Sequence, residues 1–231
     1  TLKIFSAENF LKLKKHSIAC IGCPVGCRHF LSIKNGKYKG SEFSISCPAG
    51  AICYYSGPSA IWDLDETIRF TELGNRYGLD SHSAGNILGF AIELFEKGIL
   101  DKCKSGNLEL RWGDAETLKE LLRRIAYREG LGNVLAEGVA EASKKIGNYA
   151  EKYAIHQMGL SIEDDPRCSV GTTVLSQFTG VTGGDVTHQH VFVIEREGKT
   201  TVHLGVDPLP ISAEQYVKKM AIPADAAKRI F

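Results

Sequence analysis

Three cysteines lie within eight positions near the start of the chain. Cys20, Cys23 and Cys27 form a Cys-x2-Cys-x3-Cys run. Thiolates are soft ligands that suit iron–sulfur clusters, and such short spacings let one loop supply three corners of a cubane. Gly22 and Gly26 leave room for backbone amides to approach the sulfides. The run therefore predicts a [4Fe–4S] cluster.

A structural zinc site is the alternative for the same three thiolates. Zinc sites usually add a second Cys-x2-Cys pair or paired histidines further along the chain. Cys47 and Cys53 come next, but their spacing is not that of a zinc finger. The seven cysteines are an odd number and three of them are crowded together, which disfavours a secreted disulfide framework. We expect a metal site in a reducing compartment and place the protein in the cytoplasm.

The overall composition is that of an ordinary globular protein. Of 231 residues, 43% are hydrophobic and 24% are charged. The net charge of +1 gives no sign of binding to nucleic acid or to an anionic membrane. No apolar stretch approaches the roughly 20 residues that span a bilayer. The chain begins with Thr1 rather than Met, as we expect of a fragment or a processed piece.

Four amphipathic helices are predicted in the middle of the chain. Each combines apolar residues at helical spacing with a glycine that ends the helix. Their limits are 61–77 with Asp63 or Asp65 as N-cap, Ser83 to Gly98, Asp114 to Gly130, and Asn133 to Gly147. Consecutive helices of this kind build a helical domain, so the predicted fold class is mainly α.

Only residues 29–38 are predicted to form β structure. Asn35-Gly36 is the favoured pair for a two-residue hairpin turn, so one small β-hairpin is expected directly after the cysteine run. Helical periodicity fades after about residue 155. We therefore expect one helical domain over residues 1–154, which holds the cysteine loop, and the incomplete beginning of a second helical domain over 155–231.

The sequence resembles the tungsten-containing aldehyde ferredoxin oxidoreductases over nearly its whole length. Besides the cysteine run, the likeness lies in residues 75–80 (NRYGLD), 93–100 (ELFEKGIL), 128–138 (REGLGNVLAEG) and 165–167 (DPR). Members of that family have an N-terminal pterin-binding β domain followed by two largely helical domains. The resemblance implies that this chain is the second domain with the opening of the third. The first domain and the rest of the third are then missing partners.

The resemblance also implies the cofactors, a [4Fe–4S] cluster and a tungsten (or molybdenum) bis-pterin. Asn75 and Asp80 match the ends of the family's Asp-x-x-Gly-Leu-Asp motif, which holds the pterin. Asp80 would accept from pterin N–H groups, and Asn75 through its amide oxygen. A plain helix end at Gly78 is the alternative for this stretch. The family's fourth cluster cysteine lies in an Asp-x-x-Gly-Leu-Cys run that is absent here, so the fourth ligand stays unassigned.

Two further residues bear on the type of chemistry. The aldehyde enzymes have Glu-Tyr-Glu where this chain has 42–44, Glu-Phe-Ser. Cys47 resembles a metal-ligating cysteine of the tungsten subunit of ATP-independent benzoyl-CoA reductases, although a small buried cysteine is the alternative. His188, or His190, aligns loosely with a proton-donating histidine of the aldehyde enzymes. A loop histidine without such a role is the alternative.

The resulting functional prediction is an oxidoreductase that oxidises aldehydes to carboxylic acids with ferredoxin, or another electron-transfer subunit, as acceptor. Reduction of an aryl-CoA ring is the second reading, and a non-catalytic metal-binding interaction domain is the third. A homodimer is among the expected assemblies. Because the chain is predicted to lack its pterin-binding first domain and a fourth cluster ligand, we expect the isolated chain to be inactive.

Overall fold

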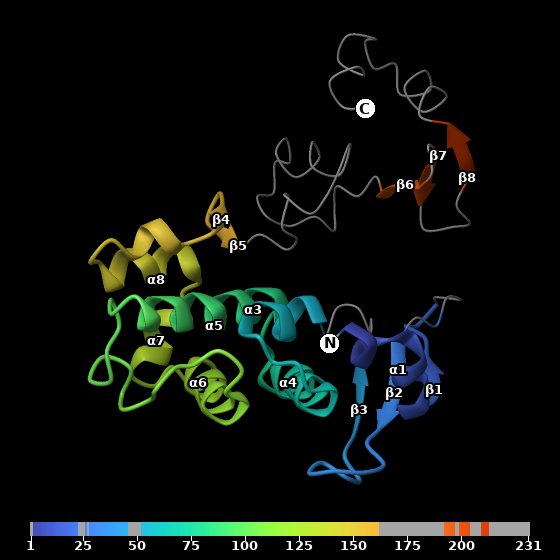
Figure 1. Cartoon of the computed structure of the whole chain (residues 1–231), viewed down its shortest axis with the longest axis horizontal. Coiled ribbons are helices and arrows are strands. Elements are labelled where there is room, and N and C mark those ends of the chain that lie inside the picture. The colour runs from blue at the N-terminus through green and yellow to red at the C-terminus, as the bar shows by residue number, and fades with distance from the viewer. Residues whose placement is uncertain are drawn as a thin grey trace. The chain divides into compact units, whose positions relative to one another are not determined.

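The structure is a computed structural model that describes residues 2–22, 26, 28–45, 52–161, 192–196, 199–203 and 209–212 (Figure 1). The chain separates into two compact units, Thr1–Ile155 and His156–Phe231. Whether these units coincide with the second and third domains of the resemblance stays a prediction. None of the helices in the described ranges has the length and apolar character that crossing a membrane requires.

The first unit opens with a small α/β layer. A 3-10 turn, η1 (Leu2–Phe5), leads into helix α1 (Ala7–Leu13) and a three-stranded antiparallel sheet. The strands lie in the order β1 (Lys14–Ile18), β2 (Arg28–Ser32) and β3 (Glu42–Ile45). Apolar residues of α1, of the sheet and of one later helix form its core: Phe5, Phe10, Leu31, Ile33, Phe43, Ile45 and Ile68.

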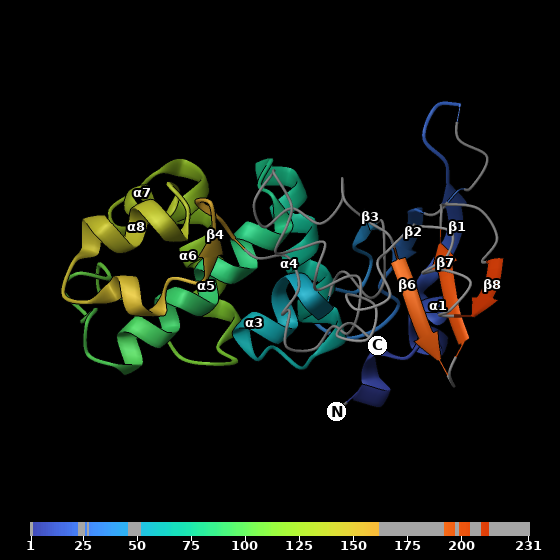
Figure 2. The ribbon, with the colours of Figure 1, turned by 90° about the horizontal axis from the view of Figure 1, so that it is seen from above.

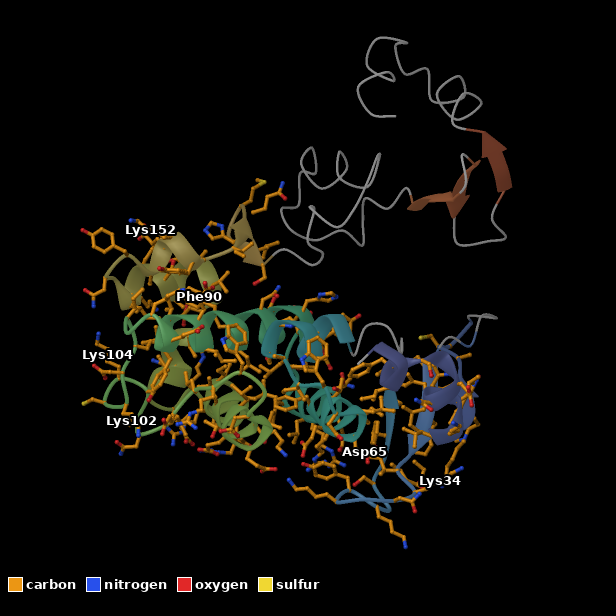
Figure 3. All side chains as sticks on the ribbon, in the orientation of Figure 1. Lys34, Asp65, Phe90, Lys102, Lys104 and Lys152 are labelled. Atoms are coloured by element: carbon orange, nitrogen blue, oxygen red, sulfur yellow. The ribbon has the colours of Figure 1, made fainter. Side chains whose placement is uncertain are left out.

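This sheet is larger than the single hairpin expected from the sequence. Strand β2 pairs with β3 rather than with residues 34–38, and Gly40 N–H donates to the Ile33 carbonyl at 2.9 Å. Asn35-Gly36 lies inside the longer connection over 33–41. Gly36 has φ +79°, and a Cβ there would lie 3.2 Å from Asp65 Oδ2, so this connection folds against the helix that carries Asp65 (Figure 3).

The helical part of the first unit is built around one central helix. α5 (Ser81–Glu96) contacts α4 (Leu64–Tyr77), α6 (Ala115–Tyr127) and α8 (Val139–Ile146), and runs between them in both ribbon views (Figures 1 and 2). Buried apolar side chains, Phe90 of α5 among them, form the shared core (Figure 3). The shorter elements are a π-helical turn η2 (Ile52–Ser56), α3 (Gly57–Ser59), α7 (Leu131–Leu135) and η3 (Ala150–Tyr153).

The mainly α fold class is confirmed, while several helix ends differ from expectation. Asp63 and Asp114 are N-caps as predicted, and Gly78 ends α4. Helix α5 is capped by Asp80 rather than Ser83, because the Asp80 carboxylate accepts from the Ser83 backbone N–H at 2.8 Å. The third helix ends at Arg128, before Gly130, because Arg128 itself takes the left-handed conformation. The fourth predicted helix is two helices, α7 and α8, separated at a glycine, Gly138, with φ +83°.

The described residues of the second unit form strands. β4 (His156–Gln157) pairs with β5 (Leu160–Ser161). β6 (Phe192–Arg196), β7 (Lys199–His203) and β8 (Leu209–Ser212) form a second antiparallel sheet in chain order. None of these strands was predicted from the sequence, because the beginning of a helical domain was expected over residues 155–231.

The backbone of helix α5 packs directly against the backbone of residues 54–58, in and after the turn η2, and this close approach requires glycine in α5. A Cβ on Gly85 would lie 1.4 Å from the Tyr54 carbonyl oxygen, and one on Gly89 would lie 2.5 Å from that of Pro58. Both obstacles are backbone atoms, which cannot turn aside as the end of a side chain can. Any side chain at Gly85 must therefore separate α5 from the turn.

We predict that Gly85→Ala destabilises the protein by at least about 2 kcal/mol, because overpacking against backbone forces a shift of whole elements. Alanine's better helix propensity offsets less than about 1 kcal/mol of that loss. Glu141→Ala on the exposed surface of α8 is the control, with an expected change within about 0.5 kcal/mol. Urea unfolding checks both variants, and equal stability of Gly85→Ala and wild type would contradict the packing described.

Candidate functional site

The cysteine run lies in sequence between two paired strands. Ile18 at the end of β1 pairs with Arg28 at the start of β2, so the residues on both sides of the run are held in one sheet. Gly22 has φ +77° and Gly26 has φ +57°, and this left-handed conformation favours glycine at both positions. Cys20 is exposed and has a free thiol. Among the described residues of the run, both glycines thus take a conformation that favours glycine, and the Cys20 thiol is accessible.

The other predicted metal ligands and the predicted proton donor lie outside the residues that the structure describes. Cys23 and Cys27 are among them, as are Cys47, two positions after the end of β3, and His188. In the part of the chain that the structure describes, no three His, Cys, Asp or Glu side chains gather as a metal site. The cluster, the Cys47 ligand and the His188 proton donor therefore stay predictions.

Asn75 and Asp80 lie at the tight corner between α4 and α5. Gly78 takes the left-handed conformation with φ +67°, and the Leu79 N–H donates to the Gly74 carbonyl at 2.9 Å. This is a Schellman-type helix end. It places Asn75 in the last turn of α4 and Asp80 at the first cap of α5, with both side chains exposed. The helix end expected at Gly78 is therefore present, and the two residues expected to bind the pterin lie on either side of it.

Each corner residue keeps an acceptor for a ligand. Asn75 donates its Nδ2 amide to the Ser44 carbonyl at 3.4 Å, which leaves Oδ1 outward as an acceptor. Asp80 accepts the Ser83 N–H through Oδ2, and its other oxygen has no hydrogen bond among the described contacts. Tyr55 lies fully buried behind α4, in contact with Gly74, and burial raises its pKa to about 12, so the phenol stays protonated.

A pocket of about 460 Å³ lies between the end of α4 and strands β2 and β3. Its lining is mostly polar and comprises Arg28, Glu42, Phe43, Ser44, Glu72, Asn75 and Arg76. Arg28 directly follows Cys27 in sequence. The pocket therefore borders the residue that directly follows the cysteine run in sequence and one end of the α4–α5 corner.

The carboxylates of this pocket are already paired. Glu72 is 5% exposed and binds Arg69 and the Nε of Arg76, the latter at 2.7 Å. Glu42 pairs with Lys15, and that hydrogen bond is the main cause of its lowered pKa. The guanidinium of Arg28 donates to Ser44 Oγ at 2.8 Å. Both carboxylates of the lining are thus paired with cations, and the lining also carries the guanidinium groups of Arg28 and Arg76.

Sequence comparison identifies the family. A family model described as aldehyde ferredoxin oxidoreductase, domains 2 and 3, matches residues 2–229. The chain belongs to the aldehyde ferredoxin oxidoreductase family. The predicted resemblance is therefore confirmed, and membership of this tungsten-containing family implies a tungsten–pterin cofactor.

Individual relatives match about two thirds of the chain. An aliphatic sulfonate oxidoreductase, WOR-like subunit, of Pyrococcus furiosus is 37% identical over 166 residues, 70% of this chain and 26% of its own length. A tungsten-containing aldehyde ferredoxin oxidoreductase of Thermococcus kodakarensis is 32% identical over 66% of this chain and 24% of its own. The chain thus spans about a quarter of the length of these relatives.

A solved structure supports the same architecture. The active-site complex BamBC of benzoyl coenzyme A reductase, in complex with 1,5 dienoyl-CoA, has a TM-score of 0.64 and 26% identity. The match covers 97% of this chain and 32% of that one. The fold of this chain therefore resembles that of about a third of the solved chain.

The described residues fit the pterin that the family implies. Asn75 Oδ1 and the free Asp80 oxygen are exposed acceptors at one corner, and pterin rings carry N–H donors that such oxygens can bind. Sequence reasoning missed Arg28, Glu72 and Arg76 as pocket residues. The position of Arg28 beside Cys27 was a usable signal. The spacing of Arg69 and Arg76, three residues before and four residues after Glu72 in a predicted helix, was another.

We predict that Asp80→Asn lowers the pterin and tungsten content of the complete protein without destabilising it. Asparagine caps a helix about as well as aspartate, so the free energy of unfolding should change by less than about 0.5 kcal/mol. The exchange removes the carboxylate's charge and halves its acceptor capacity at the corner. Asp114→Asn, the same exchange at the cap of α6, is the control and should retain full pterin content.

Metal analysis and pterin extraction measure the result. Wild-type pterin content in Asp80→Asn would contradict the assignment of Asp80 to the cofactor.

Proposed function

We propose that this chain supplies the pterin- and cluster-binding part of a tungsten oxidoreductase that oxidises aldehydes to carboxylic acids. One observation carries the proposal. Arg28, adjacent to the cysteine loop, and Asn75, at the end of the pterin motif, line a single pocket. A substrate bound there would lie close to both proposed cofactors.

The chain's own residues bind, orient and surround the reactants. Asn75 and Asp80 accept hydrogen bonds from the pterin, and Cys20, Cys23 and Cys27 hold a [4Fe–4S] cluster with a fourth ligand from elsewhere. The bound metal–pterin group supplies the two-electron redox chemistry. Overall, RCHO and H₂O give RCOO⁻, three protons and two electrons. His188 is the proposed acceptor and donor of protons.

A cluster held by Cys20, Cys23 and Cys27 would pass electrons one at a time to ferredoxin or another electron-transfer subunit. A reducing compartment keeps the cluster thiolates available, so we place the protein in the cytoplasm. One relative is named for aliphatic sulfonates. The proposed substrates therefore include small aliphatic molecules that carry a sulfonate group.

We predict that Cys23→Ser lowers iron and acid-labile sulfide together in the complete protein, because one corner of the cluster loses its thiolate. Cys103→Ser removes an exposed free thiol from a loop between α5 and α6 and should leave both contents unchanged. Anaerobic purification followed by iron and sulfide assay measures the effect. Stoichiometric zinc in place of iron in the wild type would instead support a non-catalytic metal-binding domain.

Reduction of an aryl-CoA ring is the second candidate. It is favoured by the structural match to the benzoyl coenzyme A reductase complex over 97% of this chain. Ser44 also cannot act as the carboxylate base that its position holds in the aldehyde enzymes. In this candidate Cys47 would be a ligand of the metal, and coordination would keep its thiol deprotonated.

We predict that, if ring reduction is the activity, Cys47→Ala removes one sulfur scatterer from the tungsten environment. X-ray absorption at the tungsten edge of the complete holoprotein makes the comparison. Cys53→Ala, at the nearest other cysteine, serves as the control. Identical wild-type and Cys47→Ala spectra would exclude Cys47 as a ligand and leave aldehyde oxidation as the proposed activity.

A further inference from the structure

We propose that the pocket between α4 and strands β2 and β3 is a subsite for an oxyanion on the substrate, a sulfonate or a carboxylate. Arg28 and Arg76 are its recognition residues. The inference rests on the proposed function for the identity of the reaction. The inference adds a substrate class to that function. An aldehyde enzyme without an oxyanion subsite would accept uncharged aldehydes as well as aldehydes that carry a sulfonate or carboxylate.

Arg28 is the principal donor. Its described hydrogen bond uses one Nη2 proton, donated to Ser44 Oγ at 2.8 Å. Among the described residues no carboxylate lies within ion-pair distance of it. A guanidinium has five N–H donors in a fixed fork, so most of them remain for a ligand. Ser44, which accepts from Arg28, keeps its own O–H to donate to the same anion.

Arg76 is the second donor, and Glu72 fixes one side of its guanidinium. Its Nε donates to Glu72 at 2.7 Å, and Glu72 is 5% exposed and also bound by Arg69. The described contacts of Arg76 leave its two terminal nitrogens unused. A buried acid that anchors one side of a guanidinium presents the other side in a defined direction. Arg76 thus lines the pocket as an oriented cation.

The local charge balance favours an anion. The two carboxylates of the lining, Glu42 and Glu72, are each bound by cations from the surrounding residues. The lining and its direct partners together hold four cations against these two acids: Arg28, Arg76, Lys15 and Arg69. The excess of two positive charges at the pocket attracts an oxyanion.

Two sources could present this oxyanion, the substrate and the phosphate of the pterin cofactor. Bidentate recognition by arginine suits sulfonate, carboxylate and phosphate alike. We assign the subsite to the substrate because Asn75, at the pocket wall, is proposed to face the pterin ring itself. The experiment separates the two sources by measuring anion binding and cofactor content in the same variants.

The test uses the complete holoprotein as wild type, Arg28→Gln, Arg28→Lys and the control Arg123→Gln. Arg123 on α6 pairs with Glu120 and Glu129 and does not line this pocket. Calorimetry measures the dissociation constants of ethanesulfonate and propionate as probes. Tungsten and pterin contents are measured on the same samples, and dye reduction is assayed with uncharged and sulfonate-bearing aldehydes.

Arg28→Gln should weaken ethanesulfonate binding by roughly 10- to 100-fold, the loss expected for a charge-assisted hydrogen bond. Arg28→Lys should bind between Arg28→Gln and wild type, and Arg123→Gln should equal wild type, all with full cofactor content. Equal affinity in wild type and Arg28→Gln overturns the proposal. Loss of pterin in Arg28→Gln also overturns it and assigns the oxyanion to the cofactor.

Failure of the proposed function is distinguishable from these results. If no aldehyde is oxidised by the wild type but ethanesulfonate binding still depends on Arg28, the subsite stands and the reaction is wrong. If aldehydes are oxidised without any preference for charged ones, and binding is independent of Arg28, the reaction stands and the subsite is wrong.

Discussion

Helix α4 is the element on which the site depends, because it belongs to two hydrophobic cores at once. Ile68 is fully buried in the core of the small sheet, and Phe70 is fully buried in the helical core. The cysteine hairpin and the α4–α5 corner are therefore positioned against one helix. Its last turns then carry Glu72, Asn75 and Arg76 to the edge of β3, where they form one side of the polar pocket.

The corner between α4 and α5 also combines two roles in a few residues. Gly78 ends α4 in the left-handed conformation, and two residues later Asp80 caps α5. A corner this short leaves two exposed acceptors close to two helix ends. The helix end that the structure shows and the pterin site that we propose thus involve the same six residues, 75–80. Substitutions there must be chosen so that capping survives, which is why asparagine at position 80 is more informative than alanine.

Much of this could be predicted from the sequence, for identifiable reasons. Helix ends are local signals, as at the N-caps Asp63 and Asp114 and at Gly78. The family motifs are patterns of consecutive residues, so the sequence alone contains them. Strand β1 was missed because Lys14–Ile18 is mostly polar and pairs with residues across the cysteine loop. The pairing of β2 with β3 depends on a connection that folds onto Asp65, and the pocket depends on β3 lying beside the last turns of α4. Such features depend on tertiary contacts that no local pattern encodes.

The central claim is that the cysteine hairpin and the α4–α5 corner hold two redox cofactors on either side of one pocket. Anomalous diffraction from crystals of the complete protein, collected at the iron and tungsten edges, tests it most directly. The account predicts an iron peak within the loop over residues 19–27 and a tungsten peak beside the pocket that Asn75 and Arg28 line. A zinc peak in the loop, or tungsten absent from the pocket, would contradict it.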